Sequence, residues 1–307
     1  MKHDTAGDPI TGLKWTRRTT AKVAAELRTV GIEVSAKTVA RLLKQMGFSL
    51  RVNHKKISRT SPDERDLQFA RIAELREQFA AAGLPVISVD GKKKEMVGNF
   101  KNAGTAWNRT PVAVNDHDFH SDATGIAIPY SVYDLQANRG TVFVGTSYDT
   151  PQFAADAIAR WWRSEGQRRY PGAGELAILA DAGGSNGPRC RAWKHGLQHD
   201  LCNRHGLTVT VAHYPSGASK WNPVEHRLHS EISKNWAGRP LDSYETVLNY
   251  LRTTRTSRGL QVRATLVRKR YAKGVKITDA QMSDLAIAND EFLPKWNYTL
   301  TPAAEPS

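Results

Sequence analysis

Three acidic residues lie where the sequence predicts the ends of strands. Asp90 directly follows the apolar, β-branched run LPVISV, and Asp181 directly follows the run ELAILA. Glu225 lies in the first turn of a predicted helix that comes after the run LTVTVA. In a sheet whose strands are joined by helical crossovers, ligands collect outside the carboxyl ends of the strands. We therefore expect the three carboxylates to converge, although an acid at a strand end is also a common cap of a turn or helix.

Carboxylates without a cysteine or a cluster of imidazoles form a set of hard oxygen ligands, which suits Mg²⁺ or Mn²⁺ better than zinc. Two such ions roughly 4 Å apart activate an attacking oxygen and stabilise a leaving oxygen at phosphorus. The glycine-rich turn at residues 182–187 follows Asp181 and lets another backbone approach closely. The expected cofactors are two Mg²⁺ (or Mn²⁺) ions, and the expected ligands are Asp90, Asp181 and Glu225.

The distribution of charge indicates a polyanionic partner. The chain has 307 residues, with 44 Lys and Arg against 30 Asp and Glu, for a net charge of +14. Residues 14–56 carry a local charge of +9 and residues 239–276 carry +8, so the rest of the chain is slightly acidic. Scattered surface charge for solubility would not be segregated in this way. Two basic flanks are typical of a protein that holds phosphate backbones while its centre does something else.

The first basic flank predicts a helix-turn-helix. Residues 20–30 and 36–46 each have helical apolar spacing, Gly31 separates them, and Ser35 is a suitable N-cap for the second helix. We expect Val39, Leu42, Leu43 and Met46 to form the buried face of that helix. The opposite face is polar or basic and suits a DNA major groove, although similar helix pairs occur in proteins that never touch DNA. The candidate DNA contacts on it are Lys37, Thr38, Arg41 and Lys44.

The centre of the chain predicts an α/β domain with a mixed sheet flanked by helices. A helix at residues 62–82 is expected to connect it to the first flank. The elements that follow have the order βββαβαβα, which implies three antiparallel strands followed by parallel ones. The expected strands are 84–89, 127–135, 141–147, 175–180 and 207–212, and the expected helices are 151–165, 188–203 and 223–236.

Several long motifs resemble one known family. They are SVDGKKKEMVGNFKN (88–102), ILADAGGSNG (178–187), HYPSGASKWNPVEHRL (213–228) and WNYTL (296–300). The chain resembles the ISAzo family of bacterial insertion-sequence transposases from about Leu13 to Leu300. The resemblance implies an RNase H-like fold with a DDE catalytic domain, in which Asp90, Asp181 and Glu225 are the catalytic acids. Because family members usually have a longer N-terminal part with a further DNA-binding segment, we expect this chain to lack part of that region.

Basic and aromatic residues near the acids are further candidates for DNA contacts: Lys92, Lys93, Lys94, Lys220 and Trp221. The lysines after Asp90 equally suit a solvated loop, and Trp221 suits either stacking on an unpaired base or packing. We expect Trp161, Trp162 and Trp193 to lie on the buried sides of the predicted helices. We expect His117, Asp118 and His120 to belong to a loop, and leave His226 open between a catalytic role and a surface position.

These observations predict a DNA transposase that cleaves at element ends and transfers the freed 3′-hydroxyl into target DNA. The alternatives are an inactive or truncated remnant that only binds DNA, and a metal-dependent nuclease of the same fold. The expected partners are double-stranded DNA and further copies of the chain, as a homodimer or higher oligomer on DNA. The expected domains are a helix-turn-helix (13–58), a connector helix (59–83), the catalytic domain (84–238) and a basic C-terminal extension packed on it (239–307).

The expected location is the cytoplasm, in association with the nucleoid. No apolar run approaches the ~18 residues that cross a bilayer, and the first residues, MKHDTAGDPI, contain no signal-peptide core. The two cysteines, Cys190 and Cys202, are too few for a disulfide framework or a four-cysteine zinc site, so we expect reduced thiols.

Overall fold

The computed structural model describes residues 5–7, 14–16, 19–49 and 62–303. The chain divides into two compact units, residues 1–56 and 57–307, and each is described by itself. The domain boundaries predicted at residue 13 and at residues 58 and 59 lie outside the described residues.

The first unit contains the predicted helix pair. Helix α1 spans Thr20–Thr29 and α2 spans Ala36–Gln45. Ser35 caps α2 as predicted, because its side chain accepts a hydrogen bond from the backbone N–H of Thr38 at 3.1 Å. Strands β1 (Thr5–Gly7) and β2 (Lys14–Thr16) pair antiparallel in the same unit and were not predicted.

The core of this unit is narrower than the sequence predicts. Val23, Ala24 and Val39 are buried, with Leu43 packed against them. Leu42 and Met46 were expected on the same buried face, but they are 40% and 69% exposed. The prediction is wrong at these two positions because α2 packs on a single ten-residue helix, which covers only a thin stripe, and Met46 is already the C-cap.

The second unit is built on a mixed sheet with the strand order β10-β11-β8-β7-β3-β5-β6-β9, and β4 pairs with β5 off this path. At its centre, β3, β5 and β6 are antiparallel, whereas β3, β7 and β8 are parallel. The central order β6-β5-β3-β7-β8 is that of an RNase H-like sheet, so the predicted fold class is confirmed. The bounds are β3 Val86–Gly91, β4 Glu95–Val97, β5 Gly125–Asp134, β6 Arg139–Gly145, β7 Glu175–Ala180 and β8 Thr208–His213.

The C-terminal region supplies strands to both edges of this sheet. Strand β9 (Gln261–Val267) runs parallel to β6, and β11 (Asn297–Leu300) runs antiparallel to β8. Strand β10 (Ile287–Asn289) pairs with β11 outside it. The sequence predicted an extension packed on the domain, whereas these residues are part of the sheet itself.

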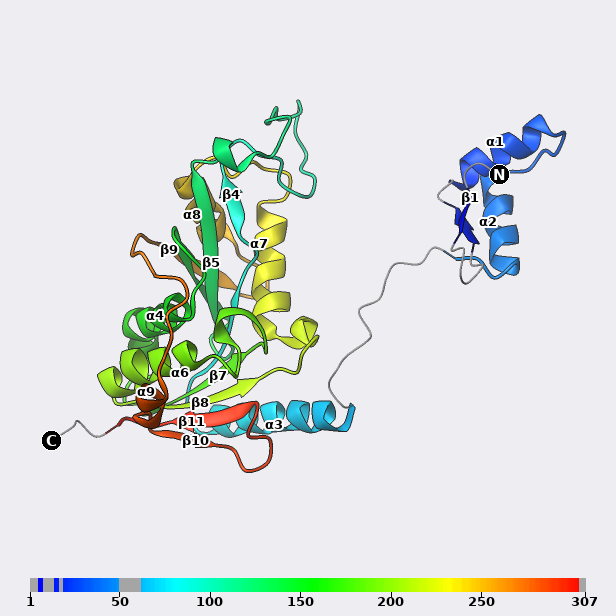
Figure 1. Cartoon of the computed structure of the whole chain (residues 1–307). Helices are drawn as coiled ribbons and strands as arrows, with labels where there is room; N and C mark the ends of the chain where they lie inside the picture. Colours follow the sequence, from blue (N-terminus) through cyan, green and yellow to red (C-terminus); the bar gives the residue numbers. More distant parts are fainter. Residues whose placement is uncertain (1–4, 8–13, 17–18, 50–61, 304–307) are drawn as a thin grey trace. The chain divides into compact units, whose positions relative to one another are not determined.

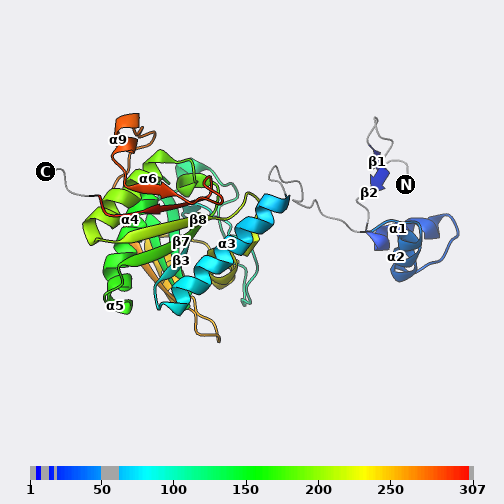
Figure 2. The same cartoon turned by 90° about the horizontal axis from the view of Figure 1, so that it is seen from below.

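Helices cover both faces of the sheet (Figure 1). Helix α4 (Pro151–Trp161) and α6 (Arg191–Leu197) pack on one face, where Trp161 and Trp193 are fully buried as predicted. Helices α7 (Ser230–Asn235) and α8 (Tyr244–Thr253) pack on the other. Helix α3 (Pro62–Ala81) crosses β3, β7 and β8 on that second face, so it belongs to this unit (Figure 2). The short helix α9 spans Asp279–Ser283.

Three predicted helices contain π-helical turns. The segment expected at 151–165 continues from α4 into η3 (Trp162–Gly166) and α5 (Gln167–Arg169), and α6 continues into η5 (Gln198–Asn203). The helix that carries Glu225 begins as η7 (Val224–His229) and continues as α7. Single π-helical turns inside helices are frequent at functional sites. Among the described residues, no helix is both long and apolar enough to span a bilayer.

Candidate active site

Strand register places Asp90 beside Asp181. Strands β3 and β7 are parallel, and Val89 lies opposite Ala180. The next residue of each strand is therefore an acid at the same carboxyl edge of the sheet. The predicted convergence of these two carboxylates is thus present, and the charge of Asp181 raises the pKa of the Asp90 carboxyl.

Glu225 comes to the same edge of the sheet at the end of the loop that follows β8. Strand β8 ends at His213, level with Ala180, and the chain passes through η6 (Ser219–Trp221) before η7 begins. The backbone carbonyl of Asn222 accepts the N–H of Glu225 at 3.0 Å, which starts the helix. The Glu225 carboxyl then lies close enough to Asp90 to raise the pKa of the Asp90 carboxyl.

The electrostatics of the three acids favour the presence of a cation. Burial, followed by the charges of Asp181 and Glu225, raises the pKa of Asp90 to about 9. Burial also raises the pKa of Asp181 to about 6, against the opposing effect of a hydrogen bond from the Gly183 backbone. The raised pKa of Asp90 favours a protonated carboxyl in the metal-free site, and a divalent cation would compensate the same negative charge.

The donor set fits a hard divalent ion. The Oδ1 atom of Asp181 is buried and has no hydrogen-bond partner, so it is available as a ligand. In the part of the chain that the structure describes, no three His, Cys, Asp or Glu side chains converge tightly enough to hold an ion in this conformation. Coordination of one ion by all three acids therefore requires their carboxylates to move closer together. Oxygen ligands alone select Mg²⁺ or Mn²⁺ over zinc.

In metal-free buffer, Asp181→Asn should be more stable than the parent at pH 8, but not at pH 4. The folded-state pKa of Asp181, about 6, lies above its ordinary value, so the folded protein binds more protons than the unfolded chain between these pH values. The free energy of unfolding of the parent therefore falls as the pH rises through this window. Asp181→Asn cannot ionise at this position, so it does not lose that stability. Melting temperatures in a chelator at both pH values test this. An equal difference between the two proteins at pH 4 and pH 8 would contradict it, and added Mn²⁺ should reverse the order at pH 8.

A buried hydrogen-bond chain orients the backbone at Asp181. His213 Nδ1 lies 2.9 Å from the Asp181 carbonyl oxygen, and His213 Nε2 lies 3.2 Å from the Tyr298 hydroxyl. Burial lowers the pKa of His213 to about 4, so the ring is neutral and donates one hydrogen bond and accepts the other. Trp193 Nε1 donates to the Tyr298 hydroxyl at 2.9 Å. The sequence analysis missed these supporting residues, although Tyr298 lies in the quoted WNYTL motif.

The three lysines after Asp90 differ in their surroundings. Lys92 is almost buried, with its Nζ atom 3.3 Å from Glu95 and 4.5 Å from the ring centre of Trp236. Its charge is therefore engaged inside the protein instead of facing a DNA strand. Lys94 lies 3.8 Å from Asp149 and is half exposed, and Lys93 is exposed. The latter two can reach a phosphate backbone.

Trp221 lies at the edge of the site between two cations. Trp221 is 44% exposed, with Lys220 Nζ 4.0 Å and the Arg65 guanidinium 5.1 Å from the centre of its ring. Phe69 of α3 packs against it with the ring centres 5.6 Å apart. Helix α3 thus contributes Arg65, a residue that sequence reasoning did not connect with the acids. The exposed ring can stack on a base while the cations approach phosphates.

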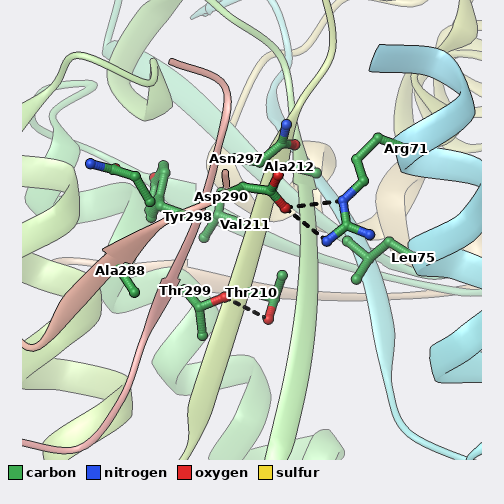
Figure 3. Close-up of a pocket in the computed structure, with 11 residues that line it drawn as sticks. Arg71, Leu75, Thr210, Val211, Ala212, Ala288, Asp290, Asn297, Tyr298 and Thr299 are labelled. Atoms are coloured by element: carbon green, nitrogen blue, oxygen red, sulfur yellow. Dashed lines mark hydrogen bonds and ion pairs between the residues drawn. The ribbon is translucent and has the colours of Figure 1, made fainter. Parts of the chain in front are cut away.

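Two cavities near these elements differ in their use. A cavity of about 220 Å³ adjoins Asp181 and is lined by the glycine-rich turn and by residues 215–218, so it can admit substrate. A smaller one, of about 100 Å³, lies between α3 and the β10–β11 hairpin (Figure 3). There Arg71 donates to Asp290 at 2.8 Å, which fastens the hairpin to α3. None of the three acids lines this smaller cavity, so it is separate from the candidate active site.

The other candidates lie outside the cluster of acids. His117 and Asp118 are exposed in the loop between β4 and β5, as predicted, whereas His120, also exposed, begins the short 3-10 helix η2 (His120–Asp122) in the same segment. His226 is exposed on η7 beside Glu225, and the side chain of His229 on the same element is buried. Cys202 is buried and Cys190 is half-buried, and both are free thiols.

Comparison with known proteins gives one family match over almost the whole chain. The family described as "Rhodopirellula transposase DDE domain" matches residues 1–302. A comparison with curated proteins finds no match.

Solved structures with a similar chain fold are complexes of the Mos1 transposase. The "Mos1 transposase paired-end complex with left transposon end" is 16% identical, with a TM-score of 0.42. The match covers 76% of this chain and 65% of that one, so it spans just under two thirds of the Mos1 chain. The Mos1 strand transfer complex is 15% identical with a TM-score of 0.45, covering 76% of this chain and 64% of the other.

Proposed function

Since the chain belongs to the family of transposase DDE domains that matches residues 1–302, we propose that it is a DNA transposase acting at the ends of an insertion sequence. It would hydrolyse a phosphodiester bond at the element end and direct the freed 3′-hydroxyl at target DNA. The observation that supports this most directly is that Asp90 and Asp181 lie at adjacent carboxyl ends of β3 and β7, with Glu225 near enough to raise the pKa of both.

The three acids are proposed as the catalytic residues and as the ligands of two Mg²⁺ or Mn²⁺ ions, a dependence on divalent metal that the family implies. When bound, the ions would activate the attacking oxygen and stabilise the leaving oxygen. The protein's own part is to hold the carboxylates in place on β3, directly after β7 and on η7, with the Asp181 backbone fastened through His213. The cavity beside Asp181 would give a scissile phosphate access to that carboxylate.

Exposed basic residues are proposed to hold the DNA. Near the acids these are Lys93, Lys94 and Lys220, with Trp221 as a stacking surface for a base. In the first unit, Lys37, Arg41 and Lys44 are exposed on α2, which supports a recognition role for that helix. Thr38 is half-buried and its hydroxyl contacts Ser35 at 3.0 Å, so we propose a phosphate contact for it at most.

Two copies of the chain are proposed to assemble on DNA, because joining two element ends to one target requires two sites. The protein would act where its substrate lies, at the nucleoid in the cytoplasm. Intact acids at all three positions argue against the alternative of an inactive remnant that only binds DNA.

A strand-transfer assay separates a transposase from a nuclease of the same fold. A labelled duplex from the DNA that flanks the gene is incubated with the protein, Mg²⁺ and a supercoiled plasmid. We expect covalent joining of the labelled 3′ end to the plasmid. Nicking of the duplex without any joined product would favour the nuclease, and neither product in Mg²⁺ or Mn²⁺ would favour the remnant.

A further inference from the structure

We infer that Ser88 is a positioning residue that holds the helix bearing Glu225 in register with the strand bearing Asp90. Ser88 is fully buried on β3, two residues before Asp90. Because alternate residues of a strand point to the same face, Ser88 and Asp90 share one face of the sheet. This inference deepens the proposed function and rests on it, since it concerns the geometry of the same acids.

One hydroxyl joins the two elements by two hydrogen bonds. Ser88 Oγ donates to Oδ1 of Asn222 in a short contact, and it accepts the backbone N–H of Val224 at 3.1 Å. Asn222 is fully buried, and its Nδ2 atom has no hydrogen-bond partner. Without Ser88, therefore, no hydrogen bond of the described structure would hold the Asn222 side chain.

These bonds replace a cap that the helix itself lacks. The first N–H groups of a helix have no partner inside the helix, and a side chain just before it usually accepts one of them. Here the preceding residue is Pro223, which makes no side-chain cap bond. Ser88 accepts the Val224 N–H from 136 positions upstream, while the Asn222 carbonyl accepts the N–H of Glu225 at 3.0 Å.

The start of the helix is therefore fastened to β3 as well as to its own loop. Glu225 follows Val224 directly, and its carboxyl meets that of Asp90. A shift of the helix start moves Glu225 relative to Asp90, and misplacement of a reacting group by 1 Å can cost about 10²-fold in rate. Residues that orient metal ligands typically change metal affinity or activity by about 10- to 100-fold when they are replaced.

The test compares Ser88→Ala with Ser243→Ala in the full chain. Ser243 caps α8, where its side chain accepts the Thr246 N–H at 3.1 Å, so both changes remove a serine cap of a helix. Three quantities are measured for each variant: the melting temperature, the Mn²⁺ affinity from the Mn²⁺ dependence of that temperature, and single-turnover nicking of the gene-flanking duplex. Gel-shift affinity for the duplex shows whether DNA binding is unchanged.

We expect Ser88→Ala to weaken Mn²⁺ binding about 10-fold and to slow nicking about 10²-fold, with DNA affinity unchanged. Ser243→Ala should lower the melting temperature yet leave Mn²⁺ affinity and nicking within twofold of the parent. Ser88→Ala that binds Mn²⁺ and nicks within threefold of the parent would overturn the inference. So would equal losses in the two variants, because they would reflect stability alone.

The behaviour of the parent protein distinguishes a failure of this inference from a failure of the proposed function. A parent that neither responds to Mn²⁺ nor nicks DNA overturns the proposed function, whatever Ser88 does. A parent that does both, with an unaffected Ser88→Ala, overturns only the role of Ser88. If Ser88→Ala does not fold, Asn222→Ala removes the other side of the same contact and is expected to give the same two losses.

Discussion

Nicking of an element-end duplex is expected to fall about 10³-fold in each of Asp90→Asn, Asp181→Asn and Glu225→Gln. Each amide removes one anionic oxygen ligand from the proposed metal site. Losing about 4 kcal/mol of transition-state stabilisation slows a reaction about 10³-fold. Single-turnover nicking of the gene-flanking duplex in Mg²⁺ measures the effect.

Folding and DNA binding should survive these three substitutions. The amides keep the size of the side chains and remove repulsion among buried carboxylates, so the melting temperature of the metal-free protein should not fall. DNA affinity should stay within about twofold, because the exposed basic residues supply it.

Glu231→Gln is the matched control for Glu225→Gln. Glu231 lies six residues further along the same continuous helix, and its carboxylate pairs with Lys234 at 2.7 Å. The Glu231→Gln variant should nick the duplex at the rate of the parent. Near-parent nicking by Asp90→Asn, Asp181→Asn or Glu225→Gln would show that the acid concerned does not take part in the reaction.

Affinity for DNA is expected to fall roughly 10³- to 10⁵-fold between 50 and 200 mM salt. A protein that makes about 6 to 10 phosphate contacts releases a counterion at each contact, and the loss of DNA affinity with salt grows with the number of contacts. The two basic flanks contain enough positive charge for this. Gel-shift titrations at four salt concentrations give the slope, and a flat response would exclude a mainly electrostatic interface.

Arg41→Ala and Lys44→Ala test which part of that interface belongs to α2. Each should reduce the salt slope by about 1 if the residue contacts a phosphate. Both side chains are exposed, so the melting temperature should not change. Lys295→Ala is the control, because Lys295 Nζ already lies 2.7 Å from both carboxylate oxygens of Glu64. If Arg41→Ala and Lys44→Ala show the same salt slope as Lys295→Ala, DNA recognition must lie in other residues.

Local pattern was sufficient for most of the elements of this protein. The strand predicted at 175–180 coincides with β7, and Ser35 caps α2 as expected. Apolar periodicity and caps act within a few residues, so the sequence carries them directly. The same reasoning placed Asp90 and Asp181 at strand ends, and parallel pairing then brought them together.

The edge strands of the sheet were not predicted. Strand β9 alternates buried residues such as Val262 and Ala264 with exposed ones such as Arg263, which is a strand pattern, but the surrounding basic residues led to its interpretation as a surface extension. It becomes a strand because β6 offers an unpaired edge parallel to it. Such pairing depends on a partner more than a hundred residues away, and local propensity is weak beside it.

The acids at strand ends and the two basic flanks can be read from neighbouring residues along the chain. Only the folded chain brings the Glu225 carboxyl near Asp90, the Val224 N–H to Ser88 and the His213 ring to the Asp181 backbone. The same holds for the ion pair of Lys92 with Glu95 inside the protein. The physical reason is that hydrogen bonds and burial depend on which surfaces the fold brings together, whereas periodicity and capping depend only on neighbours along the chain.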